Sequence, residues 1–159
     1  MSATHDFDFL HGSWVVRHRK LRRRLAGDTS WDEFGGTMRC RPILSGLGNV
    51  DDNVIRLPDG SYEACTLRLY NPASGCWSIH WVDGRDPKLD PPLTGGFADS
   101  TGTFLGEDVF EGRPILIRFL WTPGLAAARW EQAFSDDGGA SWETNWSMAF
   151  SRADEEASA

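Results

Sequence analysis

The sequence predicts a single all-β domain, an antiparallel up-and-down barrel of about nine or ten strands that follows a short helical turn. Short segments of alternating apolar and polar residues recur roughly every 8–12 residues, and turn residues separate them. Almost no segment has helical period. Consecutive hairpins with short turns favour a meander over a Greek key, which needs long connections. A chain of 159 residues suits one domain that buries roughly two-thirds of its unfolded surface.

The predicted elements follow one another closely. Residues 7–12 (FDFLHG) form the helical turn, which ends at glycine. Gly35 and Gly36 indicate a bulge or a bend, a common device where a sheet curls into a barrel. Residues 83–92 (DGRDPKLDPP) form the longest polar loop. The predicted strands are residues 13–24, 31–40, 50–57, 63–70, 77–82, 95–98, 103–110 and 115–121, and a hairpin over residues 129–152 ends the barrel.

This final hairpin has one aromatic face and one polar face, because successive side chains of a strand point to opposite sides. A sheet of this kind covers a core on one side and meets water on the other. The predicted aromatic face consists of Trp130, Gln132 and Phe134 on the first strand and of Trp142, Thr144, Trp146, Met148 and Phe150 on the second.

The turn of this hairpin, residues 135–142 (SDDGGASW), fits the pattern S-x-D-x-G-x-x-W. It resembles the Asp box of sialidases and related propellers, where the box is a structural turn repeated in each blade. It occurs once here, in a chain too short for a propeller. We therefore interpret it as a structural turn and infer no glycosidase activity from it.

The two ends of the predicted barrel meet. Trp14 opens the first strand after Gly12, and Arg152 closes the last strand. The first and last strands of a closed meander are neighbours, so we expect the Arg152 guanidinium to lie over the Trp14 ring as a structural clamp, worth about 0.5–2 kcal/mol. This pair resembles the G-x-W start and the terminal arginine of the lipocalin (calycin) barrels.

Longer segments extend the resemblance, namely FDFLHGSWVVRHRKL, CRPILSGLGNVDDN, TLRLYNPASGCWSIHWVD and ARWEQAFSDDGGASWETNW. Together they are similar to a family of uncharacterised bacterial lipocalin-like proteins, known as a domain of unknown function. The similarity covers residues 7–152. It implies a calycin-type barrel with an internal pocket, and it implies no particular reaction.

The aromatic content favours an internal ligand site. Eight Trp and nine Phe exceed what a small barrel needs to fill its core, although core packing is the default for each residue taken singly. A flat apolar ligand would lie among these rings, with Gln132 and Thr144 as polar anchors. The other predicted ligand-binding residues are His18, Trp31, Met38, Trp81, Trp121, Trp130 and Trp146.

His18 shares the inward phase of Trp14 and Val16, which places an imidazole in an aromatic interior. Three interpretations stay open: a core histidine bonded to a neighbouring strand, a ligand contact, and a general acid or base. Residues 83–92 are open to two interpretations, a gate over the pocket or a solvated connection.

Charge excludes some partners. The net charge of −7 argues against nucleic-acid binding. Residues 17–24 (RHRKLRRR) nevertheless hold six of the 16 Lys and Arg. We interpret them as a solvated outer strand that prevents edge-to-edge pairing, or as a docking patch for an anionic partner.

Three cysteines without CxxC spacing indicate free thiols in a reducing compartment. The first residues lack the pattern of a signal peptide, and no apolar run reaches membrane-spanning length. We therefore expect a cytoplasmic protein without membrane association. No two histidines stand at metal-ligand spacing and no motif indicates a cofactor, so we expect neither a metal nor a cofactor.

These observations favour a protein that binds a small hydrophobic or aromatic molecule inside the barrel. The alternative is a cofactor-independent isomerase, cyclase or hydrolase that uses His18 as acid or base in the same pocket. A third hypothesis is a packed barrel that docks a partner through residues 17–24. A homodimer formed through an outer sheet face is also compatible with the sequence.

Overall fold

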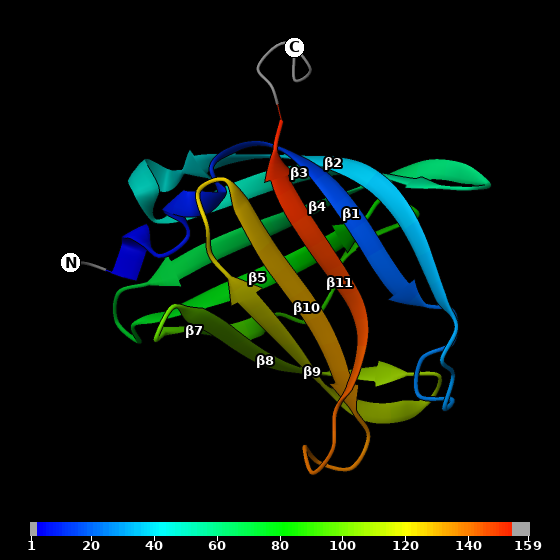
Figure 1. The fold of residues 1–159 in the computed structure, drawn as a ribbon. Helices are drawn as coiled ribbons and strands as arrows, with labels where there is room; N and C mark the ends of the chain where they lie inside the picture. Colours follow the sequence, from blue (N-terminus) through cyan, green and yellow to red (C-terminus); the bar gives the residue numbers. More distant parts are fainter. Residues whose placement is uncertain (1–2, 154–159) are drawn as a thin grey trace.

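A closed antiparallel barrel organises the protein, as the sequence predicts. A computed structural model describes residues 3–153 and shows ten strands in a ring, with one further short strand at the rim (Figure 1). The strands are β1 (Gly12–Leu21), β2 (Trp31–Ile43), β3 (Gly48–Leu57), β4 (Gly60–Asn71), β5 (Cys76–Asp83), β6 (Asp86–Leu89), β7 (Leu93–Ala98), β8 (Thr101–Phe110), β9 (Arg113–Thr122), β10 (Ala127–Ser135) and β11 (Glu143–Arg152).

Three short 3-10 turns accompany the strands: η1 (Ala3–His5), η2 (Asp8–Leu10) and η3 (Leu44–Gly46). None of the helical segments among residues 3–153 has the length and apolar character that crossing a membrane requires. Residues 153–159 are small and acidic, and the sequence predicts a disordered tail there; all of them except Ala153 lie outside the described residues. The backbone N–H of Ala153 donates a hydrogen bond to the carbonyl oxygen of Ser13, so this residue still belongs to the barrel.

The ring closes in two places. β1 pairs with β11 along seven residue pairs, from Trp14 opposite Arg152 to Lys20 opposite Trp146. β4 pairs with β5, and β5 in turn pairs with β7. Every strand in the ring therefore has two neighbours, which leaves no long open edge for pairing with another chain.

The segment over residues 83–92 is not the simple loop that the sequence predicts. β6 pairs with the end of β5, where Val82 lies opposite Leu89, while β7 pairs with an earlier part of the same edge. All four residues of β6 are exposed. A fully exposed strand has no alternation of buried and exposed positions, so the sequence pattern could not reveal it.

β1 ends at Leu21, earlier than residue 24, because the Asp28 carboxylate accepts a hydrogen bond from the Arg23 backbone N–H and holds a turn. Of the two alternatives predicted at Gly35 and Gly36, a bulge or a bend, the bulge is wrong, since β2 pairs in continuous register with β1 and β3 there. A Cβ on Gly36 would lie 2.4 Å from the Val54 carbonyl oxygen, so this glycine permits close approach of the neighbouring strand.

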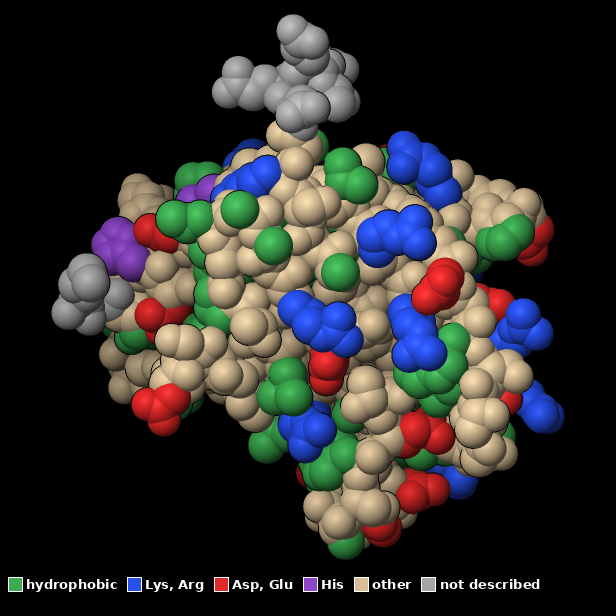
Figure 2. Space-filling model, viewed as in Figure 1, with side chains coloured by type: hydrophobic (Ala, Val, Ile, Leu, Met, Phe, Trp, Pro, Cys, Tyr) green, Lys and Arg blue, Asp and Glu red, His purple; other side chains and the backbone are tan. Residues whose placement is uncertain are grey.

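The two faces of the sheet differ. Trp14, Val16 and His18 of β1 are buried inside the barrel, whereas Arg17 and Arg19 are exposed on the outside. Basic and acidic side chains are interspersed on the outer face that Figure 2 shows. The outer part of the basic segment therefore fits the interpretation as a solvated strand.

The N-terminal turns close one end of the barrel (Figure 1). Phe7 is 1% exposed, and its ring packs edge-on against the rings of Trp77 and Phe97, at a centroid distance of 5.0 Å from each. The indole N–H of Trp77 donates to the carbonyl oxygen of Ala3. An aromatic plug thus fills this end and leaves the opposite end for access.

The Arg152 guanidinium lies 3.8 Å from the centroid of the Trp14 ring, in the stacked arrangement that the sequence predicts. It also donates hydrogen bonds to the carbonyl oxygens of Phe9, His11 and Leu125. One cation therefore joins the last strand to the first strand, to the N-terminal turns and to the loop before β10.

Glycine is required next to this clamp. Gly12 has a φ of +112°, and a Cβ there would lie 2.6 Å from a guanidinium nitrogen of Arg152. Both the backbone conformation and the close approach exclude a larger side chain. The glycine of the G-x-W start is therefore explained by its contact with the arginine.

The Asp-box turn is stabilised by its own side chains. The Ser135 hydroxyl accepts a hydrogen bond from the Gly139 backbone N–H and donates one to Asp137, whose carboxylate also accepts from the backbone and hydroxyl of Ser141. These hydrogen bonds, led by the one from the Ser141 hydroxyl, lower the pKa of Asp137 to about 2. The turn is structural, as the sequence analysis interprets it.

Replacing Arg152 with alanine should lower the free energy of unfolding by about 1–3 kcal/mol, because three carbonyl oxygens lose a charged donor and Trp14 loses a cation–π contact. Urea unfolding followed by tryptophan fluorescence measures the change. The matched control is Arg129→Ala. Arg129 is half-exposed, and among the described residues its one ion pair is with Glu131. We expect the control to cost less than about 1 kcal/mol. Equal losses in the two variants would contradict the clamp.

Candidate functional site

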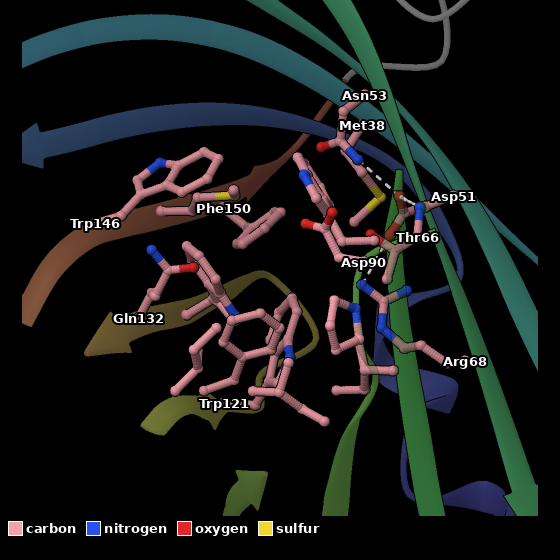
Figure 3. A pocket seen from close by; sticks show the side chains of 18 of the residues that line it. Met38, Asp51, Asn53, Thr66, Arg68, Asp90, Trp121, Gln132, Trp146 and Phe150 are labelled. Carbon is pink, nitrogen blue, oxygen red and sulfur yellow. Dashed lines mark hydrogen bonds and ion pairs between the residues drawn. The ribbon is translucent and has the colours of Figure 1, made fainter. Parts of the chain in front are cut away.

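A cavity inside the barrel is the candidate site (Figure 3). Its volume is about 70 Å³, and it adjoins an outer cavity of about 300 Å³ near the end that the N-terminal turns leave open. Six residues line both cavities: Trp81, Asp90, Asp108, Ile117, Gln132 and Trp146. The two spaces therefore adjoin each other, and a path from the rim to the centre of the barrel would run through both of them.

Four tryptophans from four strands line the inner cavity, namely Trp81 of β5, Trp121 of β9, Trp130 of β10 and Trp146 of β11. Met38 of β2, which pairs with Trp14 of β1, also lines the inner cavity. The Trp146 ring makes edge-to-face contacts with Trp81 and Trp130, at centroid distances of 5.8 and 5.2 Å. Such contacts hold the rings in fixed orientations, so the aromatic wall is preformed.

The other side of the inner cavity carries a buried polar network that the sequence analysis missed. Arg68 of β4 forms an ion pair with Asp51 of β3 at 2.8 Å, and the two side chains are 4% and 1% exposed. The guanidinium also donates to Asn49, while Asp51 accepts from the Asn53 side chain and from the Thr66 backbone N–H. Burial raises the pKa of the Asp51 carboxyl, and the charge of Arg68 opposes this rise.

Two buried donors at this cavity have no partner. The Nε of Arg68 and the indole N–H of Trp121 are inaccessible to water and make no hydrogen bond within the described residues. The centre of the guanidinium lies 5.4 Å from the centroid of the Trp121 ring, so the two residues are neighbours. An unsatisfied buried donor costs about 1–3 kcal/mol, so both N–H groups destabilise this part of the barrel.

A β-bulge changes the predicted polar anchors. The register between β10 and β11 shifts after Gln132, which pairs with Trp146, so that Ala133 pairs with Thr144 and Asn145 is the extra residue. Asn145 is fully buried and accepts a hydrogen bond from the Gln132 amide at 2.8 Å. Thr144 is exposed, so the prediction that it faces the cavity is wrong, because the bulge reverses the alternation at that point.

Trp31 is also outside the cavity. It begins β2 opposite Leu21, and its ring lies under the guanidinium of the exposed Arg19, at 4.2 Å. The buried positions of β2 are the even ones from Phe34 to Cys40, and Trp31 has the opposite phase. The prediction of an interior Trp31 is therefore wrong, since the buried phase of β2 is the one that begins at Phe34.

His18 is a core residue behind the aromatic wall. It is 2% exposed, its ring stacks on Phe34 at 4.8 Å, and its Nδ1 accepts a hydrogen bond from the Trp146 indole N–H at 3.1 Å. It lines neither cavity. Burial, with a smaller effect of the Lys20 charge, lowers the pKa of His18 to about 4. The imidazole is thus neutral near pH 7, and of the three interpretations the geometry supports the core histidine bonded to a neighbouring strand.

The rim of the cavity carries charge. Asp90 and Asp108 line both the inner and the outer cavity, and Asp90 and Pro91 come from the polar segment after β5. Burial and the neighbouring charge of Asp108 raise the pKa of Asp90. Within residues 3–153, no group of three or more His, Cys, Asp or Glu side chains is placed to hold a metal ion.

A weak signal for the missed network exists in the sequence. Asn49, Asp51 and Asn53 share the phase of Ile55, which is fully buried. Three polar side chains in the phase of an aliphatic one can indicate a buried polar row. Their partner Arg68 lies on another strand, however, and only the pairing of β3 with β4 brings it to Asn49 and Asp51.

The buried ion pair leads to a stability prediction. Replacing Asp51 with asparagine should lower the free energy of unfolding by about 3–5 kcal/mol, because it leaves the Arg68 cation buried without a counter-charge. Glu33→Gln is the matched control, since Glu33 pairs with Arg19 on the exposed outer face, and it should cost at most about 1 kcal/mol. Chemical unfolding measures the stability of both variants. If the Asp51→Asn variant is as stable as the control, Asp51 does not compensate the buried charge of Arg68.

The depressed pKa of His18 predicts a pH effect on stability. The unfolded chain binds a proton near pH 6.5 and the folded chain near pH 4, so stability contributed by the neutral imidazole falls as the pH drops between these values. Between pH 7 and pH 5 the loss should be about 2 kcal/mol. The other titrating groups affect the wild type and the His18→Gln variant equally, so the difference between the pH dependences of their stabilities reports on His18. If both proteins lose equal stability over this range, His18 is not the group responsible.

Known proteins show which fold this is. No protein-family model matches the chain, and a search of curated proteins found no match. Among solved structures the chain is similar to the S-type phycobiliprotein lyase CPES from Guillardia theta, with a TM-score of 0.61, 10% sequence identity, and coverage of 98% of this chain and 94% of that chain. At this identity the likeness shows the fold alone. The protein has a lipocalin-like, calycin-type barrel, while its membership of the narrower bacterial family stays a prediction.

Proposed function

We propose that the protein binds a small hydrophobic or aromatic molecule inside the barrel. The observation that carries this proposal is the internal cavity, whose wall is formed by four tryptophans and which adjoins a larger cavity near the open end. Aromatic side chains in fixed orientations provide apolar contact area, and the few polar groups among them set the orientation of a ligand.

The two volumes limit the shape of the ligand. A cavity of about 150 Å³ holds benzene, so the inner space of about 70 Å³ suits an alkyl chain or the edge of a ring. The outer space of about 300 Å³ would hold the rest of the molecule. Each buried methylene would contribute about 0.8 kcal/mol. A slim apolar group with a bulkier end fits this arrangement.

Polar groups at the inner cavity suit a ligand that carries an acceptor. The unpartnered donors of Arg68 and Trp121 lie on one side, and the Gln132 amide lies on the other. A carbonyl or ether oxygen would satisfy these N–H groups if the side chains of Arg68 and Trp121 shift toward it on binding. Gln132 thus keeps its predicted place as an anchor, and Thr144, which is exposed, does not.

The enzyme hypothesis receives less support. An enzyme that uses His18 as acid or base would need the imidazole at the cavity, and His18 instead packs behind Trp146. The similar solved structure is named as a phycobiliprotein lyase, so the scaffold serves a lyase in another protein. For this chain the likeness supports the barrel fold, and the proposal that it binds a ligand rests on the cavity.

Binding can be tested with the neutral fluorescent probe N-phenyl-1-naphthylamine and with 1-decanol as a competitor. The wild-type protein should bind the probe saturably, and decanol should displace it. Ile117→Trp adds an indole where the two cavities meet and should weaken binding at least tenfold, because it fills the path. Overpacking costs about 1–3 kcal/mol, so a melting curve must show that the variant is folded.

The control is Leu105→Trp, which adds the same side chain to a half-exposed position on β8. It should leave probe binding unchanged. Equal binding by both variants and the wild type would place the probe on the outer surface and would reject the internal site.

A further inference from the structure

Three basic side chains from different segments meet at the open end of the barrel. Lys20 comes from the end of β1, Arg24 from the loop after it, and Arg85 from the turn between β5 and β6. All three line the outer cavity, and they line a second adjoining space of about 220 Å³ together with Tyr62. The basic segment of residues 17–24 thus contributes two of its cations to the ligand path.

Each cation lies over an aromatic ring. The Lys20 Nζ lies 4.2 Å from the centroid of the Trp146 ring, and the guanidinium carbon of Arg85 lies 3.5 Å from that of Tyr62. The guanidinium of Arg24 lies 4.7 Å from the Phe110 ring. These contacts orient the side chains, so the cationic cluster is preformed before any ligand arrives.

Two of these cations lack a close counter-charge. Arg85 pairs with Asp83 at 2.7 Å, but in the described part of the chain no carboxylate oxygen lies within 4.0 Å of the charged nitrogens of Lys20 or Arg24. Burial is the largest cause that lowers the pKa of Lys20 to about 8; the charges of Arg24 and Arg85 contribute to the lowering, and Asp83 opposes it. Positive charges therefore repel one another at this point.

Acidic groups line the outer cavity beside the three cations, namely Asp83, Asp86, Asp90 and Asp108. Asp83 pairs with Arg85, and Asp86 pairs with Lys88. Among the residues that line the space of about 220 Å³ the one carboxylate is that of Asp32, which pairs with Arg22, so cations outnumber carboxylates there. Glu111 and Glu143 act on Arg24 at longer range, where they oppose the lowering of its pKa by burial.

We propose that Lys20, Arg24 and Arg85 bind the anionic head group of an amphipathic ligand, a carboxylate or a phosphate, whose apolar part enters the barrel. Lysine supplies a compact charge, and the two guanidinium groups supply planar forks of donors that match oxyanions. A bound anion would also remove the repulsion within the cluster. This inference rests on the proposed function, and it specifies the class of ligand.

Four ten-carbon probes test the head group: decanoate, decyl phosphate, 1-decanol and decylammonium. Displacement of N-phenyl-1-naphthylamine at pH 7 should show at least tenfold tighter binding of an anionic probe than of decanol. Decanoate and decyl phosphate then distinguish between the two oxyanions. Lys20→Met should remove most of this preference for the anionic probes over decanol, because methionine is nearly as long as lysine and carries no charge.

The chain has only two lysines, which provides a matched control. Lys88 is exposed and pairs with Asp86 on β6, and it lines none of the cavities described above. Lys88→Met removes the same charge from the molecule and should leave all four affinities unchanged. If both variants weaken the anionic probes equally, the effect arises from net charge and the subsite is rejected.

A second measurement needs no variant. Lys20, with a pKa of about 8, is half-protonated at pH 8, and a bound anion should raise this pKa. Each decanoate that binds at pH 8 should therefore cause the protein to take up about half a proton. Calorimetry in HEPES and in Tris, which differ in ionisation enthalpy, measures this uptake. Decanol should take up none, and Lys20→Met should abolish the uptake by decanoate.

The outcomes separate the two proposals. If decanol binds as tightly as decanoate, or if decylammonium binds best, the anionic subsite is wrong and the internal site remains. If neither the fluorescent probe nor any of the four compounds binds, the proposed function itself fails.

Discussion

The pairing of the first strand with the last is the constraint on which the rest of the structure depends. It turns a linear meander into a closed ring, and Arg152 secures it by stacking on Trp14 and by bonding to three carbonyl oxygens. The same guanidinium binds the N-terminal segment whose aromatic plug fills one end of the barrel. Closure therefore also determines that access is from the opposite end, where the outer cavity lies.

The interior divides into regions of different chemistry. Tryptophans form the wall of the inner cavity, and a buried ion pair between Arg68 and Asp51 faces them. Because such a pair is costly to bury, its hydrogen bonds to Asn49, Asn53 and Thr66 are what make it tolerable. The result is a cavity that is apolar along most of its surface and has a few fixed donors, which is the usual design of a site for a small ligand.

The open end adds a third region, in which cations lie over aromatic rings. A ligand that spans the path would meet Lys20 at the rim, the Trp146 ring next to it, and the donors of Arg68 at depth. His18 contributes indirectly, since it accepts the Trp146 hydrogen bond and so positions the ring on which Lys20 lies. The residue that looks most reactive in the sequence thus supports the wall of the cavity.

The fold class, the approximate strands, the end-to-end clamp and most of the aromatic wall could be predicted from the sequence, because alternation within one strand is a local property. The sequence did not determine which side chains meet. The bulge at Asn145 reverses a strand that alternates regularly in the sequence, so Thr144 faces outward. The pairing of Arg68 with Asp51, and the meeting of Lys20 with Arg85, depend on register and on closure of the ring. Contacts between strands are set by pairing over long distances along the chain, and only the tertiary structure decides that pairing.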